Sequence, residues 1–410
     1  MIDYPTLSLK ERDRRWTRTR EMMRGLGLEC LVVAGLKGRE RYEGYLSNEC
    51  IDGIVVFPAE GEPVHLTWGA HRVTRRLGST MRDVQFWIDD VRVGPYGPGL
   101  VSVLQEGWLD QASIGVVGLE SKGPAEMEGI ISFKTWSHVL GELPRARFVD
   151  VSRQFAELMI VKSQEELALV RFSAAIGERA CETMMKVTKP GATETDIYAA
   201  VMHVIHSHAA MSVAPHFILS TGPDHLGWSA PFWTYWGGRP RAVQAGDLVQ
   251  AEIFPCYGGM ETQQQMAIAL RPVMSLHEEL ATVARRAYEA GLKTLRPGIT
   301  FQEVCDAMEA PLAEAECWHL TPLIHSLTPT AWVSYIGMAI LERLPGIDRY
   351  KGIRTIPPLG GDLTIKPGMV FELEPNACRG NHRVNIGGAV IVTEHGVEEL
   401  NSLPTELRVV

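Results

Sequence analysis

The sequence lacks the patterns that mark several large classes of protein. Its 410 residues contain no run of about eighteen or more uncharged apolar residues, which a membrane-spanning helix needs. The first residues, MIDYPTLSLKERDRRW, are charged where a secretory signal peptide has an apolar core. We therefore expect a cytoplasmic protein.

Paired cysteines and an excess of basic charge are also missing. The seven cysteines are odd in number and never form a C-x-x-C pair, which argues against a disulfide framework and against a zinc site. The formal net charge is −9, whereas nucleic acids and anionic membranes attract proteins with concentrated Lys and Arg. We expect a small-molecule substrate and no nucleic-acid or membrane partner.

The first part of the chain alternates predicted helices and strands. We expect a charged helix over Leu9–Leu26, a second helix over 100–111, and strands at LECLVVAG, GIVVFPAEGEPVHLTW and 114–120. No phosphate loop or dinucleotide-binding fingerprint occurs in this stretch. The pattern is typical of a compact α/β domain, which we assign to residues 1–158 and to which we give no catalytic role.

Longer helices and antiparallel hairpins follow. Capping boxes at Ser163-x-x-Glu166 and Thr300-x-x-Glu303 predict two helix starts. Strands are predicted in GDLVQAEIFPCYGGMETQQQMAIAL, KPGMVFELEPNA and IGGAVIVTEHGVEEL. Long helices among antiparallel hairpins, without strict strand–helix alternation, indicate an α+β domain over residues 159–410.

Four of these segments, in this order, resemble the creatinase/methionine aminopeptidase/prolidase family (peptidase M24). They are KSQEELALVR, GDLVQAEIFP with its following hairpin, KPGMVFELEP and AVIVTEHGVEEL, and they span residues 162–400. The resemblance implies a pita-bread catalytic domain preceded by a smaller α/β domain, and it implies a homodimer.

In metal-dependent members of that family, two Asp, one His and two Glu hold two divalent ions. The matching positions here are Glu252, Gln263, His325, Glu374 and Gly387. A neutral amide and a glycine cannot supply the charge that holds two dications against their hydration. The resemblance therefore implies a creatinase-like member with no metal and no cofactor. A single ion held by Glu252, His325 and Glu374 is the alternative.

Creatinase is the family precedent for hydrolysis of a C–N bond without metal. The segment that carries its catalytic histidine is similar to STGPDHLGWSAP, in which that position falls on Ser229. Of the two carboxylates that would clamp a guanidinium, one corresponds to Gln265 and the other remains as Glu374. We expect a substrate that is less cationic than creatine, with His216 and His225 as candidates to replace the missing histidine.

Glu252 and Glu374 lie in apolar strands, LVQAEIF and MVFELEP, where a buried carboxylate needs a partner or a raised pKa. Two carboxylates that converge in one cavity suit general acid–base catalysis, and His325 would complete the set. The structural alternative is that all three are satisfied core residues without chemistry.

Two further features supply candidates for substrate binding. Gln263 and Gln265 flank Gln264 in one strand, so they share a face and would offer neutral amides to a polar ligand. Trp228 and Trp233 belong to an aromatic stretch that would wall the pocket, although such clusters also form cores and interfaces.

The sequence thus predicts a metal-independent hydrolase or lyase that cleaves a C–N or related bond in a small polar metabolite, with Glu252, Glu374 and His325 as catalytic residues. A single-metal enzyme and a non-catalytic scaffold of the same fold are the other two hypotheses. The register of residues 325–364 is open, because an apparent insertion there would place Ser334, instead of His325, at the family histidine.

Overall fold

The structure is a computed structural model that describes residues 4–35, 41–49, 53–79, 85–119, 131–223, 226–337, 344, 346–352 and 354–410. The chain divides into an N-terminal unit, Thr6–Met159, and a C-terminal unit, Ile160–Val410, which also includes the first residues of the chain. Those first residues go with the C-terminal unit because the ring of Tyr4 packs against Phe172 and Tyr257.

The N-terminal unit contains a six-stranded sheet in the order β4–β3–β2–β1–β5–β6. Its strands are β1 (Cys30–Ala34), β2 (Ile54–Pro58), β3 (Val64–Thr67), β4 (Asp90–Val93), β5 (Ser113–Val117) and β6 (Arg147–Asp150). Its helices are α1 (Leu9–Leu26), α2 (Tyr42–Ser47), α3 (Ala70–Ser79), α4 (Tyr96–Glu106), α5 (Phe133–Glu142) and α6 (Ser152–Ile160). Strand β1 pairs antiparallel with β2 and parallel with β5, so the sheet is mixed.

Strand β1 is apolar at every position because both faces of this sheet are covered. Cys30, Val32 and Ala34 join one buried cluster, whereas Leu31 and Val33 join a second. Strand β5 ends at Val117, three residues before the expected end, because Gly118 follows with a φ of 107°. Helix α4 ends at Glu106, before Gly107, and is shorter at this end than predicted.

The C-terminal unit contains a nine-stranded sheet in the order β11–β12–β15–β10–β8–β7, to which β16, β17 and β9 add at β15, β10 and β8. The strands are β7 (Met211–Gly222), β8 (Leu248–Tyr257), β9 (Met260–Glu261), β10 (Gln264–Ala269), β11 (Ile324–Ser326), β12 (Val370–Leu373), β15 (Gly387–Val392), β16 (Val397–Glu399) and β17 (Arg408–Val409). A separate hairpin is formed by β13 (Asn376–Arg379) and β14 (His382–Asn385).

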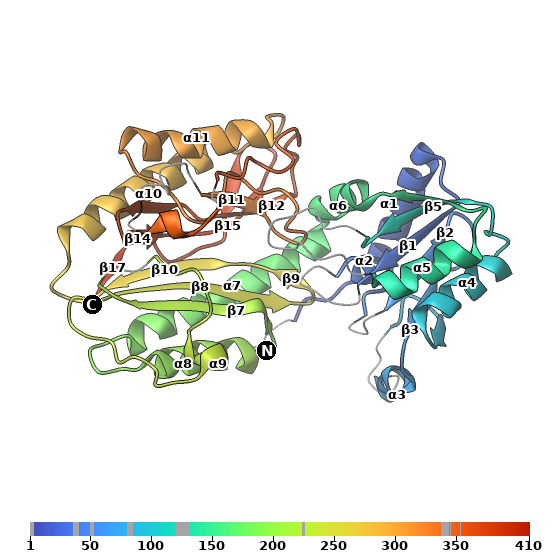
Figure 1. Ribbon diagram of the computed structural model, residues 1–410, viewed down its shortest axis with the longest axis horizontal. Coiled ribbons are helices and arrows are strands. Elements are labelled where there is room, and N and C mark those ends of the chain that lie inside the picture. The colour runs from blue at the N-terminus through green and yellow to red at the C-terminus, as the bar shows by residue number, and fades with distance from the viewer. Residues whose placement is uncertain are drawn as a thin grey trace. The chain divides into compact units, whose positions relative to one another are not determined.

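The long helices of this unit form two pairs. They are α7 (Gln164–Val187), α8 (Glu194–Ser207), α10 (Ser275–Thr294) and α11 (Phe301–Glu314), and a short α9 (Trp233–Trp236) precedes β8. Figure 1 shows α10 and α11 above the strands and α7 and α8 below them. Both predicted capping boxes are formed, at the starts of α7 and α11. Val249, Ala251 and Ile253 of β8 join the apolar cluster with α7 and α8, so the alternate residues of β8 face the other way.

The helix-rich, antiparallel C-terminal unit and the mixed N-terminal sheet agree with the predicted α+β and α/β classes. Among the described residues, none of the helices is both long enough and apolar enough to cross a membrane.

A buried histidine interrupts the apolar interior of the N-terminal unit. His65 on β3 is fully buried, and within the described part of the chain neither of its ring nitrogens has a hydrogen-bond partner. Gly53 makes room for the ring, because a Cβ at that position would lie 2.5 Å from Nε2. Burial, and then the nearby charges of Arg76 and Arg41, lower the pKa of His65 to about 4.

His65 should make the protein sensitive to acid. As the pH falls from the usual histidine pKa of 6.5 towards 4, His65 binds a proton in the unfolded state but stays neutral in the folded state. The free energy of unfolding should therefore fall over this window, by roughly 3 kcal/mol in total. Urea unfolding at several pH values should show a shallower dependence in His65→Leu than in the unmodified chain.

The matched control is His71→Leu, because His71 is an exposed histidine of the same unit. If the free energy of unfolding depended equally on pH in the unmodified chain and in His65→Leu, His65 would not be held neutral in the folded state, contrary to the prediction.

Candidate functional site

The register of three neighbouring strands brings the predicted residues together. Gln265 on β10 lies opposite Glu252 on β8 and opposite Gly387 on β15. Directly paired residues in a sheet share a face. Glu252 and Gln265 therefore both project from the face opposite the one that α7 and α8 cover, as the family register implied.

Both oxygens of the Glu252 carboxylate face nitrogen donors. The indole Nε1 of Trp228 donates to Oε2 at 2.8 Å, and Nη2 of Arg383 donates to Oε1 at 3.2 Å. Glu252 and Arg383 are each only 2% exposed, so the two charges balance each other away from water. Trp228 is 43% exposed and covers the carboxylate from the solvent side.

Glu374, directly after β12, contacts the other two predicted residues. Its Oε2 accepts a hydrogen bond from Nε2 of Gln265 at 2.9 Å, and its Oε1 lies 3.6 Å from Nε2 of His325. The other ring nitrogen of His325, Nδ1, lies 2.9 Å from the carbonyl oxygen of Ser326. A carbonyl only accepts, so Nδ1 carries a proton and Nε2 is left to exchange one with Glu374.

The hairpin β13–β14 holds these side chains from one side. Asn385 donates from Nδ2 to Oε1 of Gln265 at 2.8 Å, and its backbone N–H donates to Oε1 of Gln250. Asn376 accepts from Nε of Arg383 at 3.4 Å. Sequence reasoning missed these asparagines and could not place Arg383. The available signal was the alternation in HRVN, which puts residues 383 and 385 on one face of a strand.

A third carboxyl group, on Glu372, belongs to the same group and was also missed. It lies two residues before Glu374 on β12 and directly opposite His325 on β11, so all three share a face. Glu372 is 0% exposed, and in the described residues neither of its oxygens has a hydrogen-bond partner. Burial, and then the charges of Glu374 and Glu252, raise the pKa of Glu372 well above its usual value. The alternation in FELEP was the signal for this pair.

The backbone at Gly387 lies close to the strand that carries Glu374. A Cβ on Gly387 would lie 2.0 Å from the carbonyl oxygen of Leu373 and 2.8 Å from Cα of Glu374. This position, which resemblance matched to the last family carboxylate, therefore has no room for a side chain unless the backbone moves.

His325, and not Ser334, approaches Glu374. The Oγ of Ser334 instead accepts hydrogen bonds from the backbone N–H groups of Leu323 and Ile324, at 2.9 and 3.2 Å, at the start of β11. Ser334 thus supports the strand that carries the histidine.

The remaining predicted binding residues have other neighbours. Gln263 donates from Nε2 to Oε1 of Glu261 at 3.0 Å. The ring of Trp233 packs edge-on against Tyr198 of α8, on the helix side of the sheet, because Tyr198 in turn contacts Phe217 of the core cluster. Their roles in substrate binding stay predictions, and for Trp233 the packing favours the structural alternative.

Ser229 and His216 are exposed. His216 lies at an irregularity of β7, where its Nδ1 is 3.1 Å from the carbonyl oxygen of Ser212 in the same strand. His225 lies outside the described residues. Of the predicted set, the structure therefore brings together Glu252, Glu374, His325, Gln265 and Trp228.

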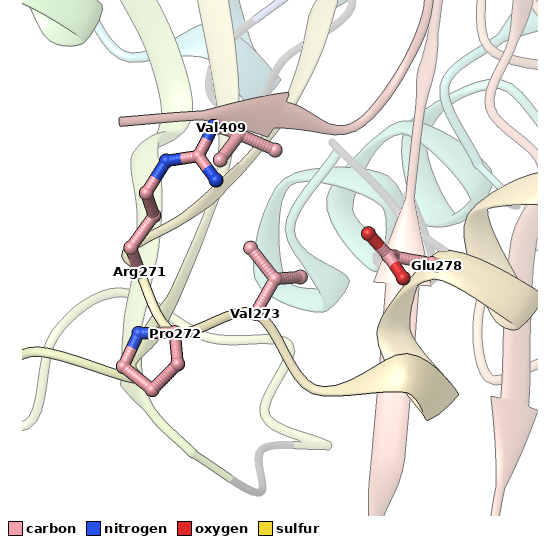
Figure 2. Close-up of a pocket in the computed structure, with 5 residues that line it drawn as sticks. All are labelled: Arg271, Pro272, Val273, Glu278 and Val409. Carbon is pink, nitrogen blue, oxygen red and sulfur yellow. The ribbon is translucent and has the colours of Figure 1, made fainter.

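A surface hollow of about 630 Å³ lies elsewhere in the C-terminal unit. Figure 2 shows the side chains that line it, which are Arg271, Pro272, Val273, Glu278 and Val409. Arg271 follows the end of β10 and lies roughly 20 Å along the extended chain from Gln265. The hollow is therefore separate from the carboxylate group.

Comparison with known proteins identifies the family. Residues 168–394, more than half of the chain, match the description "Metallopeptidase family M24". The chain belongs to this family.

Two curated relatives and one solved structure define its similarity further. A probable dipeptidase PepE of Mycobacterium tuberculosis is 29% identical over 277 residues, 66% of this chain and 65% of the relative, so less than two thirds of that relative is matched. A creatinase of Bacillus sp. (strain B-0618) is 21% identical over 411 residues, which cover 98% of this chain and 92% of the creatinase.

The crystal structure of dipeptidase PepE from Mycobacterium ulcerans aligns with a TM-score of 0.72 at 20% identity, over 99% of both chains. At that identity the likeness shows the fold. The predicted architecture, an α/β domain followed by a pita-bread catalytic domain, is confirmed.

Glu372, whose oxygens have no hydrogen-bond partner in the described residues, should lower stability at neutral pH. Because its folded pKa is raised, its contribution is fully present below the usual glutamate pKa of 4.5 and is lost as the pH rises through the folded value. Glu372→Gln removes the ionisable group at similar volume, and it should raise the free energy of unfolding at alkaline pH by about 1–3 kcal/mol.

The measurement is urea unfolding at acidic and alkaline pH. The control is Glu398→Gln, which changes a half-exposed glutamate on β16 paired with Arg171. If Glu372→Gln were less stable than the unmodified chain at alkaline pH, the assignment of a raised pKa to Glu372 would be wrong.

Proposed function

We propose that this member of family M24 is a hydrolase that cleaves a C–N or related bond in a small polar metabolite without a bound metal ion. Glu252, Glu374 and His325 would be its acid–base groups. The observation that carries the proposal is that these three side chains converge on one sheet face, where the carboxylate oxygens meet nitrogen groups of the protein itself.

The family description implies metal ions, and the donor set here does not fit a pair of them. A site for two dications needs several carboxylates with oxygens free for coordination. Both oxygens of Glu252 accept hydrogen bonds from Trp228 and Arg383, and one oxygen of Glu374 accepts from Gln265. In the described residues no group of three or more His, Cys, Asp and Glu is arranged to hold a metal.

The pair His325–Glu374 is suited to move a proton. In the proposed hydrolysis the pair takes a proton from a water molecule as its oxygen bonds to the substrate carbon. The same proton then passes to the nitrogen as the C–N bond breaks, so the pair ends as it began. An elimination would use the same groups to remove a proton from carbon, which is why a lyase is kept within the proposal.

The other residues orient this chemistry. Gln265, itself held by Asn385, fixes one oxygen of Glu374 and leaves the other towards His325. Glu252 is held between Arg383 and Trp228, and a substrate that reaches it has to displace or stack on the half-exposed indole. The homodimer that the resemblance implies stays a prediction.

Peptide-bond cleavage is the second candidate, because the curated relative PepE bears the name of a probable dipeptidase. The support for a non-peptide C–N bond is the sequence match to creatinase, which covers 98% of this chain and 92% of the creatinase. A panel of small amides, ureas, guanidines and dipeptides separates the two.

Glu374→Gln should abolish turnover. The change keeps the shape of the side chain but removes the group that exchanges a proton with His325, so we expect a fall in kcat of about 100-fold or more. The measurement is the initial rate on the best compound of the panel, with circular dichroism to verify the fold. Glu398→Gln is the control and should retain full activity, whereas near-normal turnover by Glu374→Gln would sink the assignment.

Chelation should leave turnover unchanged. Protein purified and dialysed against EDTA should contain well below one equivalent of transition metal, because both oxygens of Glu252 and one oxygen of Glu374 already accept hydrogen bonds from the protein. Inductively coupled plasma mass spectrometry and rates before and after chelation check this. A stoichiometric metal whose removal stops the reaction would instead favour the single ion on Glu252, His325 and Glu374.

A further inference from the structure

The guanidinium of Arg383 lies inside the carboxylate group and not at its rim. Arg383 comes from β14 and is 2% exposed. Its Nη2 donates to Oε1 of Glu252 and to Oγ1 of Thr321, both at 3.2 Å, and its Nε donates to Oδ1 of Asn376. Three acceptors from different parts of the chain therefore hold one cation in a defined place.

We propose that Arg383 is the resident cation of this site, supplying the positive charge that metal ions supply in other members of the family, and that it keeps divalent cations out. This inference rests on the proposed function, since it explains how the carboxylates work without metal. It adds that the carboxylates and the histidine of the site would bind a metal ion if Arg383 were absent.

The charges of the site support this role. Three carboxyl groups, on Glu252, Glu372 and Glu374, project from one sheet face; Arg383 pairs with Glu252, and His325 lies beside Glu374. A buried carboxylate that loses a cationic partner is strongly destabilised. Without Arg383, Glu252 would lose this partner, and binding of a cation from solution would restore the balance of charge.

The side chains left behind are suitable ligands. Carboxylate oxygens and an imidazole nitrogen are the donors that Mn²⁺ and Zn²⁺ take in proteins. Glu372 offers two oxygens that have no hydrogen-bond partner in the described residues, and Nε2 of His325 already faces Glu374. Removing the guanidinium therefore frees one oxygen of Glu252 on the sheet face that also carries Glu372, Glu374 and His325.

A purely structural role for Arg383 makes a different prediction. If the arginine only bridges the hairpin to Glu252 and Thr321, its removal should loosen the fold without creating affinity for metal. Metal binding thus separates the two roles, and it does so without a known substrate.

The test is Mn²⁺ binding to Arg383→Ala, with the metal alone as probe. Each protein is stripped with EDTA, dialysed against Mn²⁺ and then against buffer, and the retained metal is measured by mass spectrometry. The unmodified chain should retain little, whereas Arg383→Ala should retain about one equivalent per chain and melt at a higher temperature with Mn²⁺ than without. The double variant Arg383→Ala/Glu252→Gln should lose this metal again.

Two further variants complete the design. Arg379→Ala removes an exposed arginine of the same hairpin, paired with Glu279, and should behave like the unmodified chain. Arg383→Lys keeps the positive charge and should also exclude Mn²⁺. If Arg383→Ala does not fold, Arg383→Met, which is equally neutral, keeps most of the side-chain volume and offers Glu252 no donor, carries the same expectation.

A folded neutral variant that binds no Mn²⁺ overturns the inference, as does stoichiometric Mn²⁺ in the unmodified chain that Glu252→Gln removes. An unmodified chain that excludes Mn²⁺ but turns over no compound of the panel would sink the proposed function and leave the inference standing.

Discussion

Strand β10 lies between β8 and β15, and its register decides which side chains enter the candidate site. A shift by one residue would turn Gln263 and Gln265 towards the helices and Gln264 towards the carboxylates. The register is fixed by Met266 and Ile268 of β10, which belong to the apolar cluster with α7 and α8 and would leave it in the shifted register. Gly177 of α7 leaves room for Gln264 on the same face, because a Cβ there would lie 1.7 Å from Oε1 of Gln264. The glycine has no side chain, and the amide of Gln264 occupies the space beside the helix that a side chain would take.

With that register in place, the hairpin β13–β14 can contact two strands at once. Arg383 reaches Glu252 on β8, while Asn385 reaches Gln265 on β10 and Gln250 on β8. Glu374 is then oriented by Gln265 and approached by His325. The acid–base group is therefore assembled by a chain of polar contacts in which each member fixes the next, and such networks are effective only when nearly every group is satisfied. In the described residues, both oxygens of Glu372 and Oδ1 of Asn385 have no hydrogen-bond partner.

The proposals explain the presence of the buried carboxyl of Glu372 in this site. In a family described as metallopeptidases, this chain combines a buried carboxyl that has no hydrogen-bond partner in the described residues, an arginine among the carboxylates and a glycine with no room for a side chain. Each feature alone has a structural explanation. Together they support the proposal that Arg383 takes the place of a cation bound from solution.

Local pattern in the sequence was enough for the elements and for part of the site. The capping boxes at Ser163 and Thr300 act between residues three apart, and the alternation of Gln263 and Gln265 follows from the pleat of one strand. The family segments extended this to Glu252, Glu374 and His325, whose convergence the sheet register then showed.

What only the tertiary structure decided are the partners of those residues. Arg383 and Glu252 are 131 positions apart, and Gln265 and Glu374 are 109 apart, so no local period connects them. The packing of Trp233 on Tyr198 and the backbone approach at Gly387 likewise depend on how distant segments meet. The sequence by itself determined which polar groups the strands carry and on which face, because those follow from neighbours along the chain. Which charge balances which was decided by the fold, because that follows from neighbours in space.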